Sequence, residues 1–196
     1  MHPEILSLSL FMFVTSFSPG PNNIVASHSG FNHGMKKTIP LMLGVIFGFT
    51  TMIAIVNFGL INIFKLYPII QKTLIFTGTI FLIYLAYKIS FSKTNTQEKS
   101  LNAVTFTETF MYQFLNPKGV IVAIISVSTY VEAGNNFLNY SLWVIGVAFV
   151  FAIISIIFWV LIGKFMSKFA TNDKFIKLFN YAMSLLLLSC IATFYL

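Results

Sequence analysis

Six long apolar blocks, separated by short polar stretches, make up most of the chain. Each block is close to the roughly 20 residues that a helix needs to cross the hydrocarbon core of a bilayer. We therefore predict an all-α membrane protein in which residues 1–196 form a single transmembrane domain with six spanning helices. The predicted spans are 5–26, 39–64, 69–87, 106–131, 137–162 and 175–196.

The only long polar stretch, SFSKTNTQEKSLN at residues 90–102, divides the chain into two halves. We assign repeat one to residues 1–90, a polar cytoplasmic loop to 91–102, and repeat two to 103–196. Each half holds three spans, and an odd number of spans gives the halves opposite orientations in the membrane. The pattern thus predicts two inverted three-helix repeats, an arrangement found in many transporters.

The first span of each half is interrupted by proline. Pro19-Gly20-Pro21 breaks the first block, Asn116-Pro117 breaks the fourth, and aligning the halves on these breaks places Pro19 opposite Pro117. Proline removes a backbone donor and frees a carbonyl one turn earlier, which is costly in hydrocarbon unless another group satisfies it. Each break alone is compatible with a structural kink, but paired breaks in corresponding positions indicate a substrate site.

Polar side chains surround both breaks, and we predict that they form one binding site for a small solute. The predicted substrate-binding residues are Ser18, Pro19, Gly20, Pro21, Asn22, Asn23, Gln113, Asn116, Pro117 and Lys118. The helix N-termini that follow the prolines present free N–H groups to a carboxylate, and Lys118 adds a full positive charge. An ammonium group would be accepted by the Asn22 and Asn23 side chains or by freed carbonyls such as those of Thr15 and Ser16.

Composition supports the membrane assignment and argues against nucleic acid as a partner. The chain is 57% hydrophobic and only 9% charged, with a mean hydropathy of +0.86, whereas soluble domains are about 25% charged. The lipid bilayer is therefore its main surroundings. The net charge of +7 comes from lysines scattered between apolar blocks, with no arginine, and arginine normally leads in base and phosphate contacts.

The lysines instead indicate topology, because basic residues in short loops favour the cytoplasm. Most lie in the loops that follow spans one, three and five, which places those loops inside and both termini outside. The cytoplasmic set is Lys36, Lys37, Lys88, Lys93, Lys99, Lys118, Lys164, Lys168, Lys174 and Lys177, and the opposite set is Lys65 and Lys72.

The two breaks also carry a family resemblance. SPGPNN at residues 18–23, a glycine-spaced second span with Gly44 and Gly48, and NPKG at 116–119 make the chain similar to the LysE/RhtB amino-acid exporters. This resemblance implies export of amino acids or their derivatives from the bacterial cytoplasm across the plasma (inner) membrane, driven by the proton-motive force. Gly44 and Gly48 are also spaced for close helix packing, either within one chain or in a homodimer.

Glu108 is the one acid expected in or near the membrane on the cytoplasmic side. It is our candidate for proton coupling, and the alternative is an ordinary residue at a helix start. A cationic substrate would require a further acid besides Glu108, so we predict a neutral amino acid.

Two other functional classes fit the residues less well. A metal-cation exporter of related architecture would need several intramembrane Asp, Glu or His residues, and this chain offers at most Glu108. A membrane thiol-disulfide carrier needs two reactive cysteines, and Cys190 is the only cysteine. With no nucleophile–base–acid set in view, we expect a transporter without catalytic residues, metal or cofactor rather than an enzyme.

Overall fold

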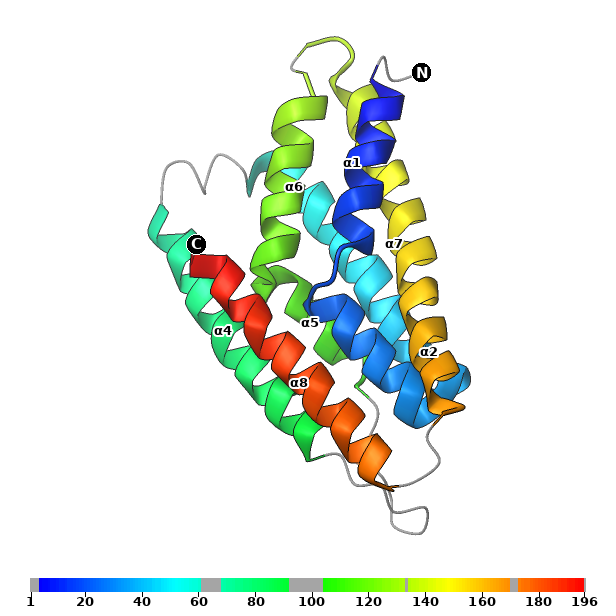
Figure 1. Cartoon of the computed structure of the whole chain (residues 1–196). Coiled ribbons are helices and arrows are strands. Elements are labelled where there is room, and N and C mark those ends of the chain that lie inside the picture. The colour runs from blue at the N-terminus through cyan, green and yellow to red at the C-terminus, as the bar shows by residue number, and fades with distance from the viewer. Residues whose placement is uncertain (1–3, 61–67, 92–103, 133, 170–172, 196) are drawn as a thin grey trace.

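The computed structural model describes residues 4–60, 68–91, 104–132, 134–169 and 173–195, and within these ranges the secondary structure is helical. The elements, coloured by position in Figure 1, are α1 (Ile5–Phe17), α2 (Pro21–Ile55), the π-helix η1 (Val56–Leu60), α4 (Pro68–Ser90), α5 (Phe106–Leu115), α6 (Pro117–Tyr130), α7 (Phe137–Ser167) and α8 (Asp173–Tyr195).

Helix length and hydropathy make this a membrane protein. In the described residues, Pro21–Gly59, Phe137–Ser167 and Lys174–Ile191 are long and apolar enough to cross a bilayer, and α5 with α6 forms a fourth candidate span bent by 62°. Two further apolar segments, Ile5–Phe17 and Phe76–Ser90, are shorter. Large apolar side chains are exposed along α1, α4, α7 and α8, as expected for surfaces that face lipid.

The first two predicted spans are continuous in the structure, because helix α2 runs from the end of the first into the second and bends at Gly34. The residue has φ 72° and ψ 173° and produces a kink inside the long helix α2. Only glycine adopts this left-handed backbone without strain. The Thr38 hydroxyl donates to the Gly34 carbonyl at 2.8 Å, which helps the chain to resume the helix after the kink. The predicted loop between these spans is therefore a sharp bend.

Glycine positions bring α2 into direct contact with its neighbours. A methyl group added at Gly30 would lie 2.3 Å from the Val160 carbonyl oxygen of α7, and one at Gly163 would lie 1.9 Å from the Ser27 carbonyl oxygen. Gly44 and Gly48 similarly meet α5. These two glycines therefore pack within the chain, which matches the intramolecular alternative.

The remaining helices pack around this centre. Helices α4 and α8 lie side by side (Figure 1), and the Ser90 and Ser184 hydroxyls bond across them at 2.7 Å. Helices α1 and α6 run in opposite directions at the end that carries the N-terminus (Figure 1). The Asn57 amide donates to the Ser141 hydroxyl at 2.8 Å; this confirms the interhelical role that a lone polar residue in a transmembrane span usually has.

Candidate functional site

The first break is a short extended segment between α1 and α2. Ser18 and Gly20 have extended backbones, and α2 starts with Pro21 at its first position. The Asn23 side-chain amide donates to the Ser16 carbonyl at 2.8 Å and to the Ser18 carbonyl at 2.9 Å. Part of the backbone freed by the prolines is therefore satisfied by the chain itself.

The second break is shorter and sharper. Asn116 alone separates α5 from α6, and α6 begins with Pro117 at its first position. Gly78 of α4 lies directly against the Leu115 carbonyl, where an added methyl group would come within 2.0 Å. Pro21 and Pro117 both stand at the first position of their helices, whereas the sequence alignment sets Pro19 against Pro117. The alignment of the two halves stays a prediction.

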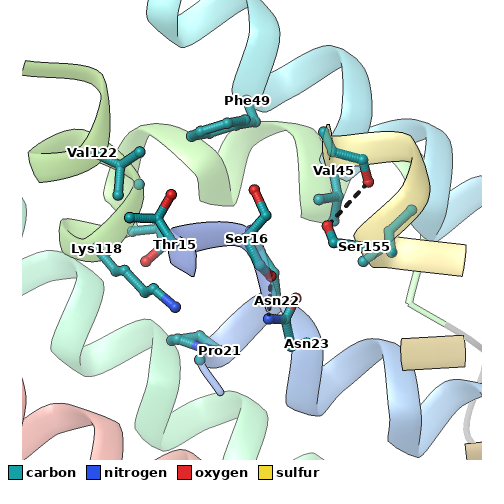
Figure 2. A pocket seen from close by; sticks show the side chains of 15 residues that line it. Thr15, Ser16, Pro21, Asn22, Asn23, Val45, Phe49, Lys118, Val122 and Ser155 are labelled. Atoms are coloured by element: carbon teal, nitrogen blue, oxygen red, sulfur yellow. Dashed lines mark hydrogen bonds between the residues drawn. The ribbon is translucent and has the colours of Figure 1, made fainter. Parts of the chain in front are cut away.

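The two breaks open into one cavity, with a volume of about 60 Å³, enough for about four waters. Six of the ten predicted residues line it: Gly20, Pro21, Asn22, Asn23, Asn116 and Lys118. Figure 2 shows the Lys118 side chain reaching across to the first break, while Phe49 lies on the opposite side of the space.

Thr15 and Ser16 at the end of α1, whose carbonyls we predicted as ammonium acceptors, also line the cavity. The remaining lining residues were not predicted from the sequence. They come from the second half of α2, the start of α6, and α7, and they are Val45, Phe49, Gly119, Val122, Ala152, Ser155 and Ile156. Ser155 is a serine in an otherwise strongly apolar part of α7, and this was the one signal that could have found it.

Lys118 ties the two breaks together. Its Nζ donates to the Ser18 carbonyl at 2.9 Å, to the Ser18 hydroxyl at 2.8 Å and to the Pro19 carbonyl at 3.4 Å. In the part of the chain that the structure describes, the one carboxylate–amine ion pair joins Lys88 to Glu108. Lys118 is thus a half-buried cation whose partners are neutral dipoles, and such a cation attracts an anion strongly.

Two helix N-termini face the same cavity without side-chain caps. Helix α2 starts after Gly20 and α6 after Asn116, and neither terminus receives a capping bond from a side chain. Uncapped N-termini carry free N–H groups and a partial positive charge. Together with Lys118, they make the cavity suited to a carboxylate.

Several predicted ammonium acceptors already have partners within the chain. The Asn22 and Gln113 side-chain amides exchange two hydrogen bonds, at 2.8 and 3.1 Å, and Gln113 is fully buried. The carbonyl of Thr15 accepts the Ser18 hydroxyl, and that of Ser16 accepts Asn23. Gln113 therefore orients Asn22 and does not itself line the cavity.

Asn116 differs from these residues because its side-chain oxygen is unsatisfied. The residue is 3% exposed, and its Oδ1 has no hydrogen-bond partner among the described residues. A buried amide oxygen without a donor is costly. Asn116 also lines the cavity, so this unsatisfied oxygen belongs to a residue of the cavity wall, although the oxygen itself is buried.

Glu108 lies at the start of α5 and does not line the cavity. It forms a capping box with Thr105, in which its carboxylate accepts the Thr105 backbone N–H at 2.8 Å, and it pairs with Lys88 at 3.4 Å. Its surroundings are those of a helix-start residue. Its assignment to proton coupling stays a prediction.

A family model of LysE type translocators matches residues 13–194. The chain belongs to the LysE type translocator family. Like other members it is a transporter, and its named relatives are efflux proteins. The cysteine/O-acetylserine efflux protein of Escherichia coli (strain K12) is 26% identical over 194 residues, covering 97% of each chain. The protein of the same name from Salmonella choleraesuis (strain SC-B67) is 28% identical, with the same coverage. No solved structure matches this translocator.

Proposed function

We propose that this LysE-type translocator exports small neutral amino acids and their derivatives, bound between the two broken helices. The family supports amino-acid export. The relatives are named for cysteine and O-acetylserine, each of which carries one carboxylate and one ammonium with no further charge.

The observation that carries the proposal is the uncompensated charge of Lys118. The cavity is lined by one lysine, two helix N-termini and no Asp or Glu side chain among the described residues. Burying a substrate charge requires a partner for that charge. The site supplies strong partners for a carboxylate and neutral dipoles for an ammonium, so a second positive charge on the substrate would have no acid to pair with.

The proposed transport cycle uses six spans arranged as two inverted repeats, with both termini outside the plasma membrane. The opposite directions of α1 and α6 (Figure 1) support this arrangement, and so do the lysines of the predicted cytoplasmic loops. We propose the proton-motive force as the driving force, with Glu108 as the coupling candidate.

Transport into inside-out vesicles that contain the purified protein tests the substrate class. With an imposed pH gradient, labelled cysteine and O-acetylserine should accumulate, whereas lysine and glutamate should not. Lys118→Ala should reduce transport by about tenfold, because a hydrogen-bonded charge is lost from the site. Lys164→Ala, which changes an exposed lysine of α7, is the matched control. Accumulation of lysine alone would contradict the proposal.

Reporter fusions test the topology separately. A reporter after Leu196 should show an external location, and one within residues 92–99 should show a cytoplasmic location. Both points lie outside the described residues. A cytoplasmic signal after Leu196 would rule out six spans with external termini.

A further inference from the structure

Lys118 occupies a binding site for an ammonium group. The Ser18 carbonyl, the Ser18 hydroxyl and the Pro19 carbonyl, which we call the Ser18 cradle, surround its Nζ at 2.8–3.4 Å. A primary ammonium has three N–H donors and no acceptor, so three converging oxygens suit it. The α-ammonium of an amino acid is chemically the same group.

Gly20 makes this position accessible to the lysine. A methyl group added at Gly20 would lie 2.9 Å from Lys118 Nζ and 3.1 Å from its Cδ. The Gly20 backbone is extended, with φ −171°, so its conformation does not require glycine. The absence of a side chain leaves space for the lysine, whose flexible stem permits other positions.

Two ammonium groups do not share the cradle, because like charges a few ångströms apart repel strongly where water is scarce. A substrate ammonium must therefore displace Lys118. The displaced lysine then needs an anion to replace its lost hydrogen bonds. The substrate's own carboxylate, attracted to the N-termini of α2 and α6, is available within the same cavity.

We propose that Lys118 and the substrate ammonium exchange places, so that the Ser18 cradle passes to the substrate while Lys118 turns to the substrate carboxylate. The unpaired Asn116 oxygen adds one further acceptor for the incoming ammonium. The exchange rests on the proposed function and makes the site selective for zwitterions. An amine without a carboxylate displaces Lys118 with no compensation, and a carboxylate without an amine leaves the cradle to Lys118.

Binding of three matched probes to the purified full-length protein tests the exchange. The probes are cysteine, cysteine methyl ester, which lacks the carboxylate, and N-acetylcysteine, which lacks the ammonium, each measured by calorimetry under reducing conditions. The native protein should bind cysteine about tenfold more tightly than either analogue, which is the usual scale for losing a charged hydrogen-bonding partner.

The Lys118→Met variant distinguishes exchange from simple attraction. Because the cradle is then free, cysteine methyl ester should bind at least about threefold more tightly than it binds the native protein, whereas cysteine should bind about tenfold more weakly. Gly20→Ala should change the affinities for the ester and for cysteine in the same directions as Lys118→Met, but by smaller factors. The added methyl group displaces only the flexible end of Lys118. Lys164→Met should leave all three affinities unchanged.

The outcomes separate two failures. Ester binding that is unchanged or weaker in both Lys118→Met and Gly20→Ala would overturn the exchange and leave neutral amino-acid export standing. A native protein that binds neither cysteine nor O-acetylserine would count against the proposed function itself. The ester comparison between native and variant protein would still decide whether Lys118 competes with an ammonium.

Discussion

The two helix breaks lie against one cavity but differ in length and in chemistry. The first is an extended segment at Ser18–Gly20, and its Ser18 carbonyl and hydroxyl oxygens accept hydrogen bonds from Lys118, which lines the cavity. The second is the single residue Asn116, and it is followed by Lys118, the donor that reaches those oxygens. One break therefore supplies acceptors, and the other supplies a cation.

The difference between the two breaks allows one cavity to offer partners for both a negative and a positive charge. Both helices that leave the breaks begin with proline and lack a side-chain cap, so each presents a positive N-terminus to the same space. If the first break also carried a lysine in place of its oxygen acceptors, the cavity would suit anions alone. The oxygens of the first break give the site a region for a positive charge, as a zwitterion requires.

The largest effect should come from removing the prolines of the first break. With Pro19→Ala and Pro21→Ala combined, α1 and α2 should join into one helix, withdraw the Ser18 oxygens and reduce export by more than about tenfold. Membrane insertion should be normal. Pro40→Ala, which removes an exposed proline within α2, is the control. Unchanged export in the double variant would reduce the first break to a structural kink.

Gly78→Ala should disturb the second break without touching the first. The added methyl group would come within 2.0 Å of the Leu115 carbonyl oxygen, so α4 and the break must separate, at a cost of about 1–3 kcal/mol of stability. Thermal unfolding should occur at a lower temperature, with reduced export. Gly146→Ala is the matched control, since its added methyl group meets no atom within 4 Å. Equal melting temperatures in the two variants would contradict this packing.

Asn116→Ala should separate binding from stability. The Asn116 oxygen has no partner within the described chain, so its loss should leave the melting temperature nearly unchanged. Affinity for cysteine should fall by about fivefold, as expected when one hydrogen bond worth about 1 kcal/mol is removed. Calorimetry and thermal unfolding measure the two quantities independently. A large loss of stability with unchanged affinity would make Asn116 a structural residue.

The smallest effect is expected for Glu108→Gln. Glutamine can replace glutamate in a capping box, so α5 should keep its start, and export down a substrate gradient should stay within about twofold of native because the residue does not line the cavity. The added response to an imposed pH gradient should be lost, because glutamine cannot carry a proton. The measurement is vesicle uptake with and without a pH gradient. If the variant loses only its response to the pH gradient, the result would support the proton-coupling role. A residue outside the two breaks would then contribute to energy coupling.

The sequence predicted the class of fold and the positions of both breaks, because proline and hydrophobicity act locally. It could not show that Pro21 rather than Pro19 begins its helix, as Pro117 does, since that depends on where the backbone becomes helical. It also missed Phe49 and Ser155, which reach the cavity only after α2 bends back at Gly34 and α7 packs against it. Their contribution arises from tertiary packing, for which a single sequence carries little signal.

The glycine contacts between α2 and α7 have a mechanical consequence. Where Gly30 meets Val160 and Gly163 meets Ser27, two backbones touch with no side chain between them. Helices slide past one another by small adjustments of interleaved side chains, and this contact has none to adjust. We expect the first half of α2 and the adjoining turn of α7 to travel as one rigid block. In alternating access, the other helices would then move relative to this block, and the first break would stay attached to it at the start of α2.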